Sequence, residues 1–188
     1  MCECVEICLC CLPCPPKSKC LCDLGEVRLD VTAPSTVIDL GADREFHKLP
    51  PGGEFTTNPA QLFGFGVGAA GARLQWTGDG PALVVVTADV SLERKAPTLD
   101  QHLVLKLNHG AGPGPLAAAT LIDDSIQQTN LLSDDQDTAV SVSATVRMQP
   151  GDIVELWAAK EGPQSPTDPM NFTAQGFVLR AHAIRRLD

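Results

Sequence analysis

The sequence contains no tyrosine, and aromatic residues make up only 4% of its 188 residues. Hydrophobic residues nevertheless account for 44% of the chain, so a sizeable core has to be built from aliphatic side chains. At this length we expect one main domain with room for a short appendage. Fifteen prolines and sixteen glycines favour many turns and argue against long helices.

Long apolar runs and positive charge are also scarce. Runs such as Ala82 to Val86 fall far short of the ~20 residues that a membrane-spanning helix needs. Glu3 and Glu6 stand where a signal peptide would carry basic residues. The formal net charge of −9 argues against nucleic-acid binding, which requires a basic surface. We therefore expect no membrane span, no signal peptide and no nucleic-acid partner.

Cysteine is absent from residues 23–188, because all eight cysteines lie in the first 22 residues. They are Cys2, Cys4, Cys8, Cys10, Cys11, Cys14, Cys20 and Cys22. Their spacing contains no two separate C-x2-C pairs well apart, which zinc ribbons and fingers use. The sequence predicts a Cys-rich, extended segment over residues 1–24, followed by a remainder with a different role.

Three interpretations of the Cys-rich segment remain open. An even number of thiols in a segment too short to bury a core is typical of disulfides, within or between chains. Closely spaced thiolates can instead hold zinc or an iron–sulfur cluster. The third interpretation is a reduced docking peptide or lipid anchor. Pro13, Pro15 and Pro16 favour an extended trace, and apolar residues stand among the cysteines.

Strand patterns begin at about residue 25. Val140, Val142 and Val146 alternate with polar residues at a period of two, and the run from Ala82 to Leu92 is rich in β-branched residues. Strands are expected over residues 27–31, 82–92, 103–107, 140–148, 153–157 and 177–184. Residues 115–124 are also expected to form a strand, although their alanines would suit a helix.

A tight turn is expected between two of these strands. Pro150 and Gly151 suit a type II turn with a positive φ at the glycine. Asp152 is expected to bond backbone amides of that turn, not to act in catalysis. Pro150, Gly151 and Asp152 are therefore candidate structural residues.

Regularly spaced strands without intervening helices predict an all-β, antiparallel sandwich. Residues 72–188 are expected to form the main domain, and residues 25–71 an arm or linker with the first strands. Within that arm, residues 32–40 suit a strand and residues 49–53 form a break. The arm is expected to reach neighbouring subunits.

Three sequence segments, taken in their order along the chain, resemble those of a known family. Residues 72–80 lead into the long strand at 82–92, a strand then ends at Asn108-His109-Gly110, and Gln149–Leu156 reads QPGDIVEL. Over roughly residues 72–187 the chain resembles the jelly roll of tumour-necrosis-factor-like and complement globular-head-like domains, particularly those in structural proteins of tailed bacteriophages. The histidine between Asn108 and Gly110 departs from the family's Asn-Gly. Aromatic residues that often line the family's threefold axis are also missing.

The resemblance implies a homotrimer in which each protomer turns one sheet toward a threefold axis. Such phage trimers decorate or cement capsids or form head fibres, with the major capsid protein or other virion proteins as partners. Leu103, Leu105 and Leu107 alternate with Val104, so that strand is apolar on both faces, as burial against partners would require. Three N-terminal segments would then bring twenty-four cysteines together.

Two rival functions stay open beside the virion interpretation. A receptor-binding tip on a tail fibre would use loops at 108–115 and 123–137 against a host surface. A cellular trimeric ligand or spore-surface protein is the other.

No catalytic constellation is visible, so an enzyme is not predicted. The G-x-S-x-G and H-E-x-x-H motifs are both absent. The glycine-rich stretch 64–71 lacks a strand-to-helix context, so it is interpreted as a flexible or tightly turned connection. The histidines, which share no metal spacing, are His47, His102, His109 and His182.

Two further motifs have ordinary explanations. Asp123, Asp124, Asp134, Asp135 and Asp137 could attract calcium but lack the EF-hand order, so a solvated loop is favoured. The stretch from Asn171 to Thr173 spells a glycosylation sequon, which would carry no sugar in a phage protein.

Overall fold

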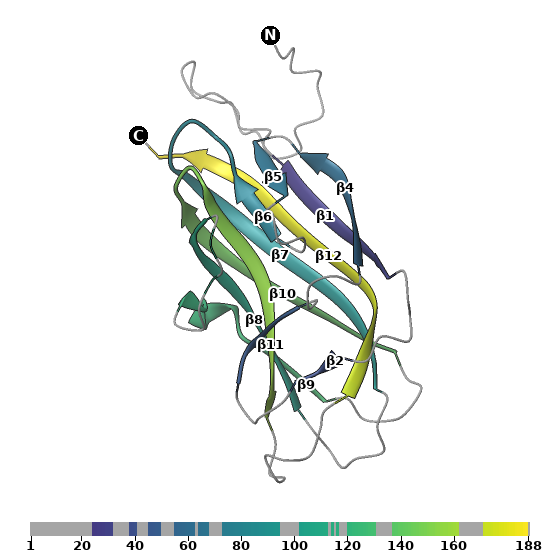
Figure 1. The fold of residues 1–188 in the computed structure, drawn as a ribbon. Coiled ribbons are helices and arrows are strands. Elements are labelled where there is room, and N and C mark those ends of the chain that lie inside the picture. The colour runs from purple at the N-terminus through teal and green to yellow at the C-terminus, as the bar shows by residue number, and fades with distance from the viewer. Residues whose placement is uncertain are drawn as a thin grey trace, which may run out of the picture.

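Figure 1 shows the computed structural model of the chain. It describes residues 24–31, 38–40, 45–49, 55–62, 64–67, 73–94, 102–112, 114, 116, 120–130, 137–161 and 171–187. The Cys-rich segment and residues 131–136 lie outside the described residues. The described part contains no helix that is long and apolar enough to cross a membrane.

Two antiparallel sheets make up the structure. Sheet A has the strand order β10-β7-β12-β1-β4, with β2 paired to β12. Its strands are β10 (Asp137–Met148), β7 (Ala82–Arg94), β12 (Asn171–Arg186), β1 (Leu24–Val31), β4 (Phe55–Leu62) and β2 (Ile38–Asp39). Sheet B has the order β5-β6-β11-β8-β9, with β3 paired to β11. Its strands are β5 (Phe65–Val67), β6 (Arg73–Trp76), β11 (Asp152–Glu161), β8 (His102–Ala111), β9 (Gln127–Asn130) and β3 (His47–Leu49).

The all-β antiparallel sandwich predicted from the sequence is confirmed. Each of the six expected strands at 27–31, 82–92, 103–107, 140–148, 153–157 and 177–184 lies inside an observed strand. The period of two is visible in β10, where Val140, Val142 and Val146 are buried while Ser141 and Ser143 are exposed. Because successive side chains point to opposite faces, this strand presents one apolar and one polar face.

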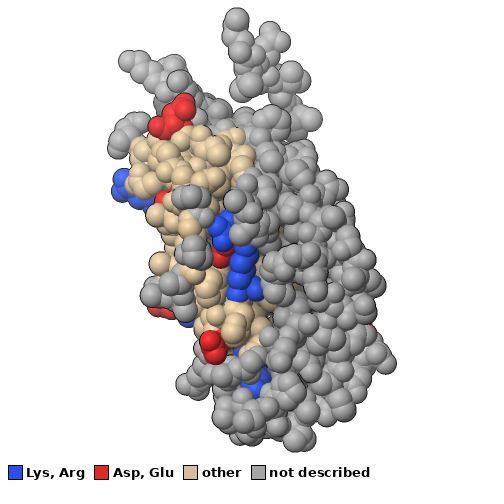
Figure 2. Space-filling view, viewed as in Figure 1, with Lys and Arg blue, Asp and Glu red and all other residues tan. Residues whose placement is uncertain are grey.

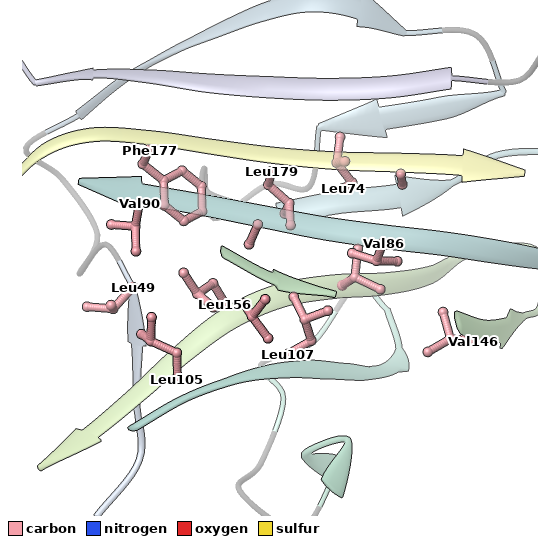
Figure 3. Close-up of a cluster of buried hydrophobic side chains, with 14 of the residues drawn as sticks. Leu49, Leu74, Val86, Val90, Leu105, Leu107, Val146, Leu156, Phe177 and Leu179 are labelled. Carbon is pink, nitrogen blue, oxygen red and sulfur yellow. The ribbon is translucent and has the colours of Figure 1, made fainter. Parts of the chain in front are cut away.

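The core lies between the two sheets and is mainly aliphatic (Figure 3). Val86 and Val90 from β7 and Leu179 from β12 face Leu105 of β8 and Leu156 of β11. At one end Phe65 packs edge-on against Trp76, with ring centroids 4.9 Å apart. The scarcity of aromatic residues is thus met by interdigitating Leu and Val side chains, as in other close-packed interiors.

The segment expected to be an arm contributes five strands to the two sheets. In sheet A, β1 pairs with both β12 and β4, and in sheet B, β3 pairs with β11 and β5 pairs with β6. Backbone pairing therefore holds the strands of residues 24–67 within the sandwich. The strand expected over 32–40 is seen at β2, and residues 32–37 lie outside the described residues.

Two local predictions are wrong. Residues 115–124 do not form the expected strand in their described part. Leu121 makes one isolated bridge to Asn108, and a 3-10 turn, η2, spans Asp123–Ser125. Residues 64–71 were expected to form a flexible or tightly turned connection. Gly64 does turn, at a positive φ of 72°, but Phe65–Val67 then form strand β5, which was not expected. Both segments are short, and tertiary contacts with neighbouring strands override local preference there.

The turn between β10 and β11 has the expected form. Gly151 has a φ of 92°. The Gln149 amide donates to Asp152 Oδ2 at 2.7 Å, and the Asp152 amide donates to the Gln149 carbonyl at 2.9 Å. The Gly151 amide also donates to the Trp76 carbonyl at 2.8 Å, so the turn is tied to β6.

Substituting Gly151→Ala should lower the free energy of unfolding by about 1–2 kcal/mol, because a Cβ disfavours positive φ. Gly114→Ala is the matched control. Neither glycine has a neighbouring atom within 4 Å of an added Cβ, and only Gly151 has a positive φ. Urea denaturation of both variants checks this. Equal stabilities would contradict the strain argument.

Candidate functional site

The four histidines and the acidic residues do not converge on one site. His47 lies on β3, His102 and His109 on β8, and His182 on β12. His109 Nε2 lies 3.1 Å from Asp152 Oδ2 at the β10–β11 turn. In the described part of the chain, no three His, Cys, Asp or Glu side chains are grouped to hold a metal ion. The described acidic pair Asp123 and Asp124 is exposed on η2.

The two outer faces of the sandwich are the remaining candidates, and the outer face of sheet B carries a buried ionic cluster. Glu155 on β11 forms ion pairs with Arg73 on β6 and with Lys48 on β3, the latter at 3.3 Å. The Glu155 and Arg73 side chains are only 1% and 4% exposed. Trp157 Nε1 donates to the other Glu155 oxygen at 2.8 Å. Three strands are therefore joined through one carboxylate.

Burial leaves an electrostatic signature on this cluster. Loss of hydration lowers the pKa of Lys48 from its ordinary value of 10.5, against the opposing attraction of Glu155. Figure 2 shows blue Lys and Arg atoms gathered along the middle of the described surface. Removing one partner from a buried ionic cluster strongly destabilises the fold, so the contributions of its members to stability depend on one another.

The connection between β8 and β9 is bonded across the same face of sheet B. Arg73 Nη1 donates to the Gly114 carbonyl at 3.3 Å, and Thr120 Oγ1 donates to Asn108 Oδ1 at 2.6 Å. The Ser125 hydroxyl accepts from the Leu107 amide at 2.9 Å. These bonds fasten the connection to β6 and β8, so the chain covers part of the face itself.

Val104 lies on the outward face of β8, and it is buried within a single copy of the chain. It is 4% exposed, and it lines a hollow of about 160 Å³ with Phe46, Lys106, Ile126, Ala159, Lys160 and Glu161. The expectation that the apolar residues on both faces of β8 require a neighbouring subunit is therefore wrong. Residues of the same chain cover Val104.

Lys106 holds a second, exposed ion pair on this side. Its Nζ lies 2.8 Å from Asp123 Oδ1 and 5.7 Å from the centre of the Phe46 ring. The hydrogen bond from Lys106 holds the pKa of Asp123 below its ordinary value of 3.8. The Asp123 side chain is 91% exposed, so solvent screens this pair strongly.

The outer face of sheet A differs from that of sheet B, because its described residues on β7, β10 and β12 are mainly small, uncharged or apolar. On β10 its exposed residues are small and uncharged from Ala139 through Ser141 and Ser143 to Thr145. On β7, Leu83, Val85 and Thr87 alternate with the core residues and are partly exposed. On β12, Ile184 is 51% exposed, one of two large apolar residues so exposed in the described chain.

A shallow hollow of about 340 Å³ lies on this face of sheet A. It is lined by Asp89, Val90, Ser91, Ala139, Val140, Ser141, Gly176, Phe177 and Val178. The hollow forms because the outward residues of three neighbouring strands are small, and because the β7–β12 register shifts between Ala174 and Gly176. Another surface can therefore approach the backbone closely there.

Among the side chains that the structure describes, Asp89 and Arg180 are the charged ones in the middle of this face, and the strand register sets Glu26 of β1 opposite Arg180. They project from β7 and β12, which pair along their whole length, and Arg180 Nη1 forms an ion pair with Asp89 Oδ2. Their side chains are 41% and 38% exposed. The other charged side chains described on the face, Glu93, Arg147 and Arg185, lie toward its ends.

Comparison with solved structures identifies the fold. The Eiger tumour necrosis factor of S. frugiperda matches with a TM-score of 0.53 at 8% identity, over 88% of this chain and 96% of that one. The chain has a tumour-necrosis-factor-like jelly-roll fold. The resemblance seen in the sequence is therefore confirmed for the fold.

Other structures match less closely. The globular domain of zebrafish complement 1qA has a TM-score of 0.44 at 12% identity, and the PRD1 vertex protein P5 has 0.46 at 13%. Each match covers 88% of this chain and 99% of the other. No protein-family model matches the sequence, and no curated protein matches it.

The structure also shows residues that the sequence did not indicate as important. Lys48, Arg73 and Glu155 are far apart in sequence, and only the pairing of β3, β6 and β11 brings them together. Asp89 and Arg180 are likewise joined by the β7–β12 pairing. The available signal for Glu155, Asp89 and Arg180 was a charge flanked on both sides by apolar residues within a strand, which usually needs a partner.

Replacing Glu155→Gln should destabilise the protein by about 3–5 kcal/mol, because the buried Arg73 and the largely buried Lys48 would lose the carboxylate with which both are paired. Asp123→Asn removes the exposed pair and should cause a far smaller loss, because solvent screens that pair. Urea denaturation of the two variants tests the difference. A loss below about 1 kcal/mol for Glu155→Gln would show that the cluster is not a unit.

Replacing Lys106→Met should raise the pKa of Asp123 toward 3.8, because the hydrogen bond that lowers it is lost. A lowered carboxyl pKa contributes stability above pH 3.8 that is lost as the pH falls through the folded-state value. The variant should lack this acid-range dependence. NMR titration of the Asp123 carboxyl measures the effect, and an unchanged pKa would contradict the assigned cause.

Proposed function

We propose that this protein is a structural virion protein that associates as a homotrimer through the outer face of sheet A. The observation that carries the proposal is the contrast between the two outer faces. Sheet B is covered in part by its own chain and holds a buried ionic cluster, whereas most of the described outward residues on β7, β10 and β12 of sheet A are small, uncharged or apolar. Such a face suits close packing against copies of itself.

The virion role rests on the sequence resemblance of residues 72–187 to jelly rolls of tailed-phage structural proteins. We infer a capsid decoration, cement or head-fibre protein that contacts the major capsid protein or other virion proteins. Binding would come from complementary shape and many weak contacts. Three linked copies would raise the overall affinity above that of a single anchor.

The Cys-rich segment is proposed as the anchor or covalent staple of the trimer. It leads directly into β1, where Leu24 pairs with His182 of β12. The segment therefore joins sheet A next to its long strands, at the same end as the C-terminus of β12 (Figure 1). Interchain disulfides, or a zinc or iron–sulfur site, at Cys2 through Cys22 would link the subunits.

Native mass spectrometry of unreduced, unchelated protein tests this proposal. A trimer lighter by about 2 Da for each disulfide would support a covalent staple. A trimer heavier by zinc, or by iron and sulfide, would support a metal site. A monomer with all thiols free would contradict both the trimer and the staple.

Substituting Ser141→Arg should convert the trimer to monomers, because the long cation would enter the hollow on the proposed contact face. Ile126→Arg is the matched control, since Ile126 is 55% exposed on the sheet B side. Size-exclusion chromatography with light scattering compares the masses. Circular dichroism confirms that both variants fold. If only Ile126→Arg produced monomers, the contact would lie on the sheet B side, and the proposed contact face would be contradicted.

The main alternative is a receptor-binding tip on a tail fibre that recognises a host surface. Parts of the two stretches expected for that role lie in strands, since residues 108–111 belong to β8 and 127–130 form β9. Copy number separates the two functions: quantitative mass spectrometry of purified particles should find hundreds of copies for decoration and only a few for a tail tip. Expression of this protein in cells that carry no virus would favour a cellular trimeric ligand or surface protein.

A further inference from the structure

The small hollow on the outer face of sheet B combines an apolar lining with a cation. Val104 on β8 and Ala159 on β11 line it and are only 4% and 1% exposed. The Phe46 ring lines it as well, and Ile126 adds an apolar side chain that is 55% exposed. The hollow measures about 160 Å³, whereas sites for drug-sized ligands or cofactors measure ~300–1,000 Å³, so its occupant has to be small.

Lys106 brings a positive charge to this apolar lining. Its side chain is 15% exposed, and its Nζ lies 5.7 Å from the centre of the Phe46 ring. Lys160 and Glu161 also line the hollow and add one charge of each sign. A lysine ammonium donates three N–H bonds and accepts none, so the partner that it binds most strongly is an anionic oxygen.

A carboxylate of the protein already contacts this cation. Asp123 Oδ1 lies 2.8 Å from Lys106 Nζ, and the Asp123 side chain is 91% exposed. The hydrogen bond from Lys106 holds the pKa of Asp123 below its ordinary value of 3.8. Solvent screens such an exposed pair, so its loss costs little free energy. Asp123 therefore shows that the cation binds a carboxylate, and its exposure makes that carboxylate exchangeable.

Exchange of this carboxylate would leave the backbone around Asp123 in place. Ser125 fastens η2 to β8, because its hydroxyl accepts from the Leu107 amide at 2.9 Å and donates to the Ile122 carbonyl at 2.6 Å. Ser125 is only 2% exposed. Neither bond involves the Asp123 side chain, so that side chain can turn into solvent while the 3-10 turn stays folded.

We infer that this hollow binds a small aliphatic carboxylate, whose carboxylate group displaces Asp123 from Lys106 and whose apolar tail lies against Val104. The tail would cover exposed apolar surface of Ile126, which the short Asp123 side chain does not. Asp123 then acts as an internal competitor for the site. The site lies on sheet B within one protomer, so the inference goes beyond the proposed trimer and does not depend on it.

The test follows the backbone amide signals of the full chain by NMR while hexanoate is added. The signals of Val104, Lys106 and Ile126 should shift saturably, with a Kd of about 1 mM for so small a ligand. Acetate lacks the apolar tail, and hexan-1-ol lacks the charge. Each should bind at least about tenfold more weakly than hexanoate.

Two substitutions examine the exchange directly. Asp123→Asn should tighten hexanoate binding by about two- to fivefold, because the competing carboxylate is removed. Lys106→Met should weaken hexanoate binding at least about tenfold, and it should abolish the preference for hexanoate over hexan-1-ol.

Asp79→Asn is the matched control for the loss of an exposed carboxylate and one negative charge. Asp79 lies in the β6–β7 connection, is exposed and does not line the hollow. The affinity for hexanoate should therefore stay unchanged in this variant. Thermal unfolding followed by circular dichroism verifies that every variant folds.

Three results would overturn the inference: no saturable shift with hexanoate, equal binding of hexan-1-ol, or no gain in affinity for Asp123→Asn. An equal gain for Asp79→Asn would also overturn it, because net charge and not exchange would be the cause. A wild type that is monomeric yet binds hexanoate as described would contradict the proposed trimer and support the carboxylate site.

Discussion

A sheet in a two-layer sandwich buries one face in the core and has to present its other face to something else. In this protein the two sheets meet that constraint differently. Sheet B folds its own β3 and the β8–β9 connection around Glu155 and its cations. Sheet A leaves most of the described outward residues of β7, β10 and β12 small, uncharged or apolar. The candidate function follows from this difference, because only one face remains suited to a partner.

Much of the fold could be predicted from the sequence, because period-two alternation depends on local residue order. Every strand with a clear pattern was placed correctly, from Val27 to Ile184. The short strands β3 and β5 were not predicted, because three residues carry no period. The 3-10 turn at Asp123 was missed because the alanines and leucines before it resemble a strand or helix segment, and its position depends on Ser125 bonding to β8.

The candidate site was much harder to predict. In the sequence, Glu155 resembles an ordinary polar residue of a strand. Its burial depends on ion pairs with Arg73 and Lys48, which lie on other strands. The apolar pattern of β8 suggested an interface, but Phe46 and Ile126 belong to the same chain and line the hollow above Val104. Fold similarity to a tumour necrosis factor adds no function by itself, since one fold hosts many functions.

The structure of the assembled oligomer, determined by electron cryomicroscopy or crystallography, tests the central claim most directly. The account predicts three copies around a threefold axis that runs in front of the outer face of sheet A, with the hollow beside Ser141 covered by a neighbouring copy. Contacts made through the outer face of sheet B, or an oligomer that leaves the hollow beside Ser141 open to solvent, would contradict it.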